Sequence, residues 1–333
     1  MTKFIGRKRN VGIGKETVRG TAVPATYWTP VMEFKNDDKI KQVINESSTG
    51  VIEDANGADI TMKMSEGELT GRINDTAFGL ILLGSLGSEP LAPVVVGGET
   101  IVYDHTFAVL ESAQHPTLTV AIEEPNATGA SGLRYALGAI DSLEIAMELE
   151  KYATYTIAFR GNSNTTGTNT PSYSASEDIF LPQHGEVKFA SNLAGLTGAT
   201  AIPVKKVTLK IAKNLEDDQV IGDIQAVDRL NKQFAVEGTV ELLYTDRTYI
   251  NTDLLGDLAQ AMRIRLANTS VTLGVSSNPE LTIDMASVKL SEVAIDQANN
   301  DLVKQTLSFK AFYSLTDASM VTAVLRNLVA TSY

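Results

Sequence analysis

The side chains that most often perform chemistry are scarce in this chain of 333 residues. It has no cysteine, so disulfides, thiolate metal sites and cysteine nucleophiles are excluded. Its three histidines, His105, His115 and His184, stand far apart, and none has the spacing of a metal-ligand pair. The 40 Asp and Glu residues are numerous enough to form pairs by chance, so they do not predict a glycosidase. The sequence therefore predicts a protein that is not an enzyme and that binds no metal or other cofactor.

One glycine-containing segment invites comparison with a phosphate-binding loop. It reads Gly12-Ile-Gly-Lys-Glu-Thr17. Arg9 stands where that pattern needs its first Gly, and Glu16 follows Lys15 where the pattern needs Ser or Thr. The segment is not predicted to bind a nucleotide.

Charge is distributed unevenly along the chain. With 28 Lys and Arg against 40 Asp and Glu, the net charge is −12. The N-terminal end is nevertheless basic, and its candidate contact residues are Lys3, Arg7, Lys8 and Arg9. Two interpretations stay open, an arm that docks on an acidic neighbouring subunit and a nucleic-acid-binding tail, and the contrast in charge favours the first. No apolar stretch reaches the roughly 20 residues of a membrane-spanning helix, so no membrane partner is expected.

The elements that would position such residues are mainly strands. Apolar and polar residues alternate at 143–150, 207–211, 234–242 and 307–311, which is typical of strands with one buried face. Three helices are predicted at 76–86, capped by Asp75, at 253–261 and at 317–330.

A run of small polar residues near the middle divides the chain. Residues 161–176 are almost all Gly, Ser, Thr and Asn, a composition typical of linkers. We therefore predict an N-terminal arm (1–25), a first domain (26–160), a linker (161–182), a second domain (183–315) and a C-terminal arm (316–333) that includes the third predicted helix.

The two predicted domains resemble each other. Residues 29–34 resemble 202–207 at an offset of 173, and Glu66-Gly67 resembles Glu237-Gly238 at an offset of 171. Residues 143–145 and 156–159 resemble 293–295 and 306–309 at an offset of 150. The preserved order favours an internal duplication over two unrelated β domains with generic alternation.

The second domain carries a resemblance to a known family. The residues that carry it are 234–249, the following Leu254-Leu255-Gly256, 261–266 and the acidic segment 207–218. Together with residues 65–73 of the first domain, they resemble the tail tube proteins of long-tailed bacteriophages, in the form with two tandem tube domains.

This resemblance implies a mainly β fold of two tandem β-sandwich or barrel domains, each with one short flanking helix. It also implies trimeric rings with pseudo-sixfold symmetry that stack into a hollow tail tube. Implied partners are further copies of the chain, tail tip and tail terminator proteins, and the tape measure protein and DNA in the lumen. The protein would be assembled in the cytoplasm of the bacterial host and would reside in the virion tail. A charge of −12 suits a conduit along which DNA must slide without tight binding.

Several acidic residues become candidates under this resemblance, although an ordinary solvated surface explains each of them as well. Candidate lumen-facing residues are Glu144, Glu148 and Glu150. Candidate inter-ring loop residues are Asp37, Asp38, Glu53 and Asp54 in the first domain and Glu216, Asp217 and Asp218 in the second. Neither loop has the ligand pattern of a calcium site.

Other classes of protein stay open at this point. A two-domain β adhesion or carbohydrate-binding protein would need an exposed aromatic cleft, and the chain has a single Trp. An enzyme on a β scaffold would need converging His or carboxylate groups. Another tail component, such as a tip or connector protein, would share the fold and differ in copy number.

Overall fold

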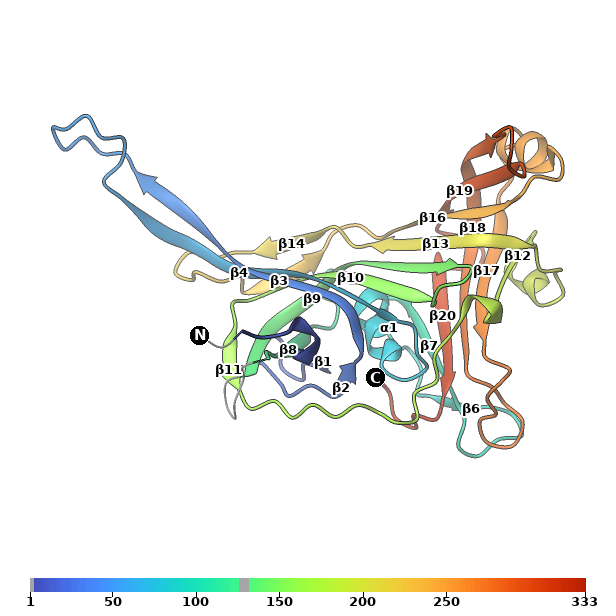
Figure 1. The fold of residues 1–333 in the computed structure, drawn as a ribbon, viewed down its shortest axis with the longest axis horizontal. Helices are drawn as coiled ribbons and strands as arrows, with labels where there is room; N and C mark the ends of the chain where they lie inside the picture. The colour runs from blue at the N-terminus through green and yellow to red at the C-terminus, as the bar shows by residue number, and fades with distance from the viewer. Residues whose placement is uncertain (1–2, 126–131) are drawn as a thin grey trace.

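Antiparallel strands make up most of the computed structural model, which describes residues 3–125 and 132–333 (Figure 1). The first half contains β1 (Asn10–Lys15), β2 (Tyr27–Thr29), β3 (Val31–Asn45), β4 (Gly57–Arg72), α1 (Phe78–Leu86), β5 (Gly87–Ser88), β6 (Val94–Val95), β7 (Tyr103–Val109), β8 (Leu118–Glu123), β9 (Gly132–Glu148), β10 (Thr154–Gly161) and β11 (Thr165–Gly167). The second half contains β12 (Gly185–Ala190), β13 (Val204–Ala212), β14 (Leu215–Asp218), β15 (Asp228–Asn231), β16 (Ala235–Leu243), the short π-helix η5 (Tyr249–Leu254), β17 (Gln260–Ala267), β18 (Glu280–Asp296), β19 (Lys304–Phe312) and β20 (Val321–Asn327). The predicted fold class, mainly β with two tandem domains and a short helix in each, is confirmed.

One continuous antiparallel sheet runs through both halves. Its strand order is β3-β4-β10-β9-β13-β16-β19-β18. The β9–β13 pairing joins the two halves, because β9 belongs to the first and β13 to the second. The alternation predicted from sequence holds here: Leu143, Ile145 and Met147 of β9 are buried, and the residues between them are not.

A second layer closes the core beneath each half of this sheet. The N-terminal half of β9 pairs with β8, which continues through β1 to β2. The N-terminal half of β18 pairs with β17, which continues to β12. Helix α1 is buried along its whole length, as expected for a helix that is apolar on every side. No described helix has the length and apolarity needed to cross a bilayer.

The N-terminus of α1 is capped differently from the prediction. Asn74 accepts the hydrogen bond from the Phe78 backbone N–H at 3.1 Å through its side-chain oxygen. The predicted cap, Asp75, instead accepts a hydrogen bond from the Asp178 N–H at 2.9 Å. The predicted cap was thus one residue too late, because the chain that returns over the helix binds the Asp75 carboxylate.

The two halves repeat the same strand pairings. The strands β1, β3, β4, β8, β9 and β10 correspond to β12, β13, β16, β17, β18 and β19. In each half a glycine lies opposite a phenylalanine on the neighbouring strand, Gly67 with Phe159 and Gly238 with Phe309. A Cβ at either glycine would lie within 2.7 Å of the phenylalanine ring, so each glycine makes room for its ring.

The irregularities of the strands repeat as well. The register of β3 on β4 shifts between Val31 and Glu33, and that of β13 on β16 shifts between Val204 and Lys206, 173 residues later. The bulge in β9 opposite Ala158/Phe159 likewise returns in β18, 150 residues later, between Leu290 and Glu292. Shared bulges at these offsets favour duplication over generic alternation.

The helix predicted at 317–330 is wrong. Residues 321–327 form β20, which pairs with β18 on one side and with β7 of the first half on the other. Val321, Ala323 and Leu325 are buried alternately, with a period of two. The spacing also fits a helix, and two neighbouring strands decide the outcome by satisfying the backbone on both sides.

The helix predicted at 253–261 is displaced and shortened. The π-helix η5 ends at Leu254, and β17 begins at Gln260. Leu255 and Leu258, two residues of the expected apolar face, are exposed. Pairing with β12 and β18 draws residues 260–267 into the sheet instead.

The predicted N-terminal arm and linker are both partly built into the first half. Residues 10–15 form β1, so the described parts of the arm outside the sheets are 3–9 and 16–25. In the linker, 165–167 form β11 beside β9, and Phe180 is fully buried. The segment that connects the two halves is thus held against the first half by strand pairing and by a buried side chain.

Candidate assembly surfaces

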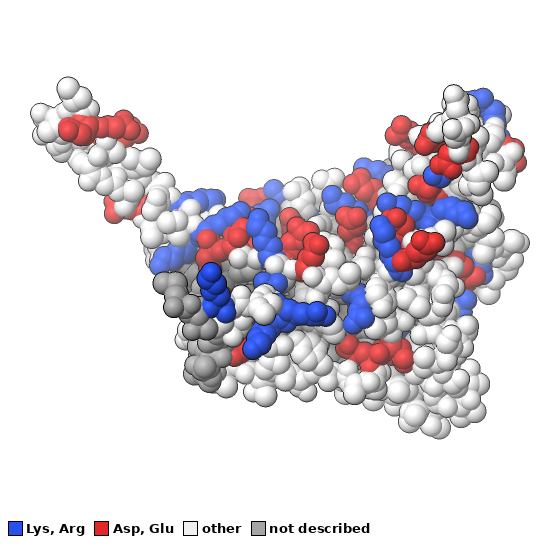
Figure 2. All heavy atoms as spheres, viewed as in Figure 1, with Lys and Arg blue, Asp and Glu red and all other residues white. Residues whose placement is uncertain are grey.

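The outer face of the long sheet carries acidic and basic side chains side by side (Figure 2). Glu144 and Glu148 project from β9 on this face and lie opposite Lys210 and Lys206 of β13. Lys206 Nζ is 3.4 Å from Glu148 Oε2. The structure thus places lysines among the candidate lumen acids, and the face has mixed charge.

Glu150, the third candidate of that group, does not extend the row of Glu144 and Glu148. It lies in the turn after β9 with a φ of 66°, where the strand's alternation has ended. Threonine hydroxyls pair on the same outer face, Thr70 with Thr156 at 2.9 Å and Thr208 with Thr239 at 2.7 Å. The face therefore offers small polar groups and paired charges.

Both ends of the long sheet are open in the part of the chain that the structure describes. There β3 pairs with β4 only, and β18 beyond Val288 pairs with β19 only. Such edges expose unpaired backbone N–H and C=O groups and are templates for another strand.

The β3–β4 hairpin extends far from the body as a two-stranded arm (Figure 1). All residues from Lys39 to Thr61 are exposed, including Val43, Ile44, Val51 and Ile52. A bare two-stranded hairpin is marginally stable in water, and exposed apolar patches mark interaction sites. We define residues 43–59 as the arm tip.

The candidate acids of the first domain divide between the tip and the base of this arm. Glu53 and Asp54 lie in the tip, where Figure 2 shows acidic side chains on a mostly uncharged arm. Asp37 and Asp38 lie at the base, and Asp38 Oδ2 accepts a hydrogen bond from Asn164 Nδ2 at 3.0 Å.

The equivalent hairpin of the second half, β14–β15, lies against the first half instead of projecting. The backbone N–H of Lys63 in β4 donates to the carbonyl oxygen of Ile224 at 2.7 Å. Of the candidate acids, Glu216 pairs with Lys232 at 3.0 Å, and Asp218 lies opposite Asp228 in the hairpin. Both acids are exposed and their cited partners lie in or beside the same hairpin, so their role between rings stays a prediction.

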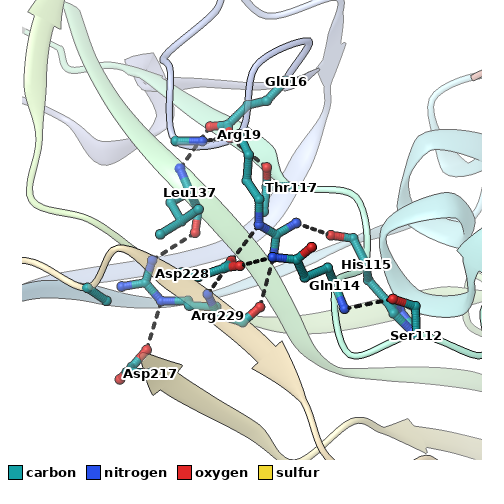
Figure 3. Close-up of polar contacts among 12 residues, drawn as sticks. Glu16, Arg19, Ser112, Gln114, His115, Thr117, Leu137, Asp217, Asp228 and Arg229 are labelled. Atoms are coloured by element: carbon teal, nitrogen blue, oxygen red, sulfur yellow. Dashed lines mark hydrogen bonds and ion pairs between the residues drawn. The ribbon is translucent and has the colours of Figure 1, made fainter. Parts of the chain in front are cut away.

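The third of these acids, Asp217, is one end of a buried polar network (Figure 3). Its carboxylate forms an ion pair with the fully buried Arg229, whose Nε is 2.9 Å from Asp217 Oδ1. Arg229 also donates to the carbonyl oxygens of Leu137 at 2.8 Å and Gly161 at 2.9 Å. Burial lowers the pKa of Arg229, and the charge of Asp217 opposes this. One side chain thus ties the hairpin of the second half to two strands of the first.

Arg19 continues the network toward the N-terminus (Figure 3). Its guanidinium forms an ion pair with Asp228 and donates to the Arg229 carbonyl oxygen at 2.8 Å. Glu16 accepts hydrogen bonds from the Leu137 N–H and the Gly20 N–H, each at 2.8 Å. Leu137 has a φ of 51° at the bend of β9, and side chains of the network satisfy both of its backbone polar groups.

Sequence reasoning did not single out Arg229 or Lys213. Lys213 is buried, and its Nζ donates to the Gly84 carbonyl oxygen of α1 at 2.7 Å. Burial lowers the pKa of Lys213 to about 7. A lone cation in a β-rich stretch has no motif to mark it, and only the fold shows that these two are inside.

The basic N-terminal residues lie on the surface beside the base of the arm. Lys3, Arg7 and Lys8 are exposed. Arg9 lies over the Phe34 ring of β3, with its guanidinium carbon 4.7 Å from the ring centroid. The contact of these residues with a neighbouring subunit stays a prediction.

An acid pair where the linker meets α1, the buried Asp75 with the half-exposed Glu177, predicts a pH effect. Burial and the nearby charge of Asp75 raise the pKa of Glu177 to about 7. Its pKa in the unfolded chain is near 4.3, so the folded state binds more protons between those values and the free energy of unfolding falls as pH rises. Because Glu177 is half-exposed, screening reduces the full effect of about 4 kcal/mol to about 1 kcal/mol.

Glu177→Gln is therefore expected to be more stable than the parent chain at pH 8 by about 1 kcal/mol and equally stable at pH 4. Urea unfolding at both pH values measures the difference. Glu46→Gln, on the exposed arm tip, is the matched control and should change neither value. Parallel pH dependences of the parent and Glu177→Gln would contradict the prediction.

Together these features define the class of protein: a duplicated β protein with two open sheet edges and a projecting arm. Among the described residues, no group of three or more His, Asp or Glu side chains is gathered to hold a metal ion. The chain matches the model of the phage tail tube protein family over residues 6–311 and belongs to that family. It is a structural tail tube protein of a bacteriophage. No curated protein matches the chain in sequence.

Proposed function

We propose that the chain assembles into rings of three subunits with pseudo-sixfold symmetry, which stack into the hollow tail tube. The observation that carries this proposal is the pair of open edges on one long sheet, β3 at one end and β18 at the other. A ring lets every such edge pair with the next subunit, which removes the aggregation hazard of a free edge.

The outer face of the long sheet lines the lumen in this proposal. Its mixed charges, such as Glu144 opposite Lys210 and Glu148 opposite Lys206, offer no continuous basic track for phosphates. DNA and the tape measure protein would then pass without tight binding, since tight binding needs clustered Lys and Arg. The role of the protein is mechanical, and catalysis has no part in it.

The arm tip and the N-terminal residues 3–9 act between rings in this proposal. Further expected partners are the tail tip and tail terminator proteins, which would close the two ends of the tube. Assembly takes place in the cytoplasm of the bacterial host, and the product resides in the virion tail.

Negative-stain electron microscopy of the purified, concentrated chain tests the proposal. We expect hollow tubes or stacked rings, and averages along the axis should show three subunits with six similar lobes. Monomers at every protein and salt concentration would contradict self-assembly, and rings of six chains would contradict the trimer.

A further inference from the structure

We propose that the open edge of β3 pairs with the open half of β18 of a second copy of this chain, in one defined register. In that register Asp37 lies opposite Ala294 of the partner, so that Lys35 faces Asp296 and Lys39 faces Glu292. This interface rests on the proposed ring assembly and specifies its lateral contact.

The template for this interface is inside the chain. The β9–β13 junction is the edge-to-edge contact between the first and second halves, with Lys210 opposite Glu144. Because the halves repeat the same topology, β13 corresponds to β3 and β9 corresponds to β18. The same edge-to-edge contact can therefore form once more, between the second half of one chain and the first half of the next.

The register follows from the two offsets that the shared bulges fix. Subtracting 173 converts a β13 residue into its β3 counterpart, and adding 150 converts a β9 residue into its β18 counterpart. The pair Lys210–Glu144 becomes Asp37–Ala294. The pairs Thr208–Ala146 and Ala212–Ser142 become Lys35–Asp296 and Lys39–Glu292.

Charge supports this register independently of the repeat. It pairs both lysines of this stretch of β3 with acids of β18, although neither pair was used to derive it. A shift of two residues in either direction instead brings Asp37 opposite Asp296 or Glu292, and like charges directly opposite each other are destabilising. A shift of one residue would turn the buried face of β3 outward.

The partner must be a second copy. Six strands separate β3 from β18 in the sheet, so their edges lie seven strand spacings apart, roughly 34 Å along the sheet at about 4.8 Å each. Figure 1 shows β3 and β18 toward opposite ends of the molecule. In the isolated chain Lys35, Lys39, Glu292 and Asp296 are all exposed. Lys35 forms an exposed ion pair with Asp37 and Lys39 forms one with Glu66, and such exposed pairs contribute only about 0.2–1 kcal/mol.

Paired cysteines test the register directly, because the chain has no cysteine of its own. The matched variant carries Asp37→Cys and Ala294→Cys, which places two Cβ atoms about 5 Å apart across the interface. The control carries Lys39→Cys and Asp296→Cys on the same strands and face, displaced by four residues or about 13 Å. After mild oxidation of assembled protein, we expect covalent oligomers of the matched variant in about tenfold excess over the control.

Microscopy of the same samples before oxidation separates the two proposals. Tubes or rings in which the matched variant cross-links no better than the control would overturn the register and leave the assembly standing. Samples of both cysteine variants and of the parent chain that contain only monomers would overturn the assembly, and the register with it.

Charge reversal covers the case in which the cysteines themselves prevent assembly. We expect the variant Lys35→Glu with Lys39→Glu to need about tenfold more protein than the parent chain to assemble. Adding Glu292→Lys and Asp296→Lys to the same chain should restore it. A parent chain that assembles, together with a fourfold variant that stays monomeric, would overturn the register.

Discussion

Arg229→Met is expected to lower the free energy of unfolding by about 3 kcal/mol, because Asp217 loses its closer cation and keeps only Arg160, 4.0 Å from Oδ2. The side chain of Arg229 is 0% exposed and that of Asp217 is 16% exposed, so water cannot replace the lost partner fully. The Leu137 and Gly161 carbonyl oxygens also lose their donors. Urea unfolding followed by circular dichroism measures the change.

The matched control for this prediction is Lys232→Met, one residue beyond β15. Lys232 pairs with Glu216, and both side chains are about half exposed. Exposed pairs contribute about 0.2–1 kcal/mol, so the control should unfold almost like the parent chain. Equal effects of the two substitutions would show that the network of Arg229 does not hold the halves together.

The same loss should release the β14–β15 hairpin locally. Segments held by few contacts open first and are cleaved first. Limited proteolysis of Arg229→Met is expected to cut within residues 219–227 faster than in the parent chain or the control. Unchanged protection of that loop would mean that other contacts, such as that of Lys63 with Ile224, suffice.

Shortening the arm is expected to abolish tubes while rings still form. The variant replaces residues 43–59 with Asn-Gly, a turn that closes two-residue hairpins, between the paired Gln42 and Ile60. Every residue removed is exposed, so the free energy of unfolding should change by less than about 1 kcal/mol. Electron microscopy of the concentrated variant should then show separate rings.

A substitution variant with an arm of full length distinguishes the arm from its charge. Glu53→Gln with Asp54→Asn keeps the length and the apolar residues of the tip but removes its two acids. If apolar contact drives stacking, this control should form tubes like the parent chain, and its failure would assign stacking to the acids. Tubes of ordinary length from the shortened chain would contradict the role of the arm between rings.

The sequence by itself determined the class of fold and its duplication. Alternation at Leu143, Ile145 and Met147 depends only on the two-residue period of a strand, so it was readable without any partner. The Gly67–Phe159 and Gly238–Phe309 matches lay within segments that the offsets of 171 and 150 had already aligned. The helix at Phe78–Leu86 could likewise be predicted from neighbouring residues, because its apolar run and the following glycine mark its extent.

The tertiary structure decided which strands pair and which charges are inside. Residues 321–327 fit a helix by spacing and became a strand because β7 and β18 flank them. Asp217 was predicted as an inter-ring or solvated loop acid and instead meets the buried Arg229, whereas Asp54 of the equivalent hairpin stays exposed. Periodicity is a property of neighbouring residues, but burial and pairing depend on other segments of the fold, such as β7 of the first half, which pairs with β20. That difference explains why the strands were predictable and the junction between the halves was not.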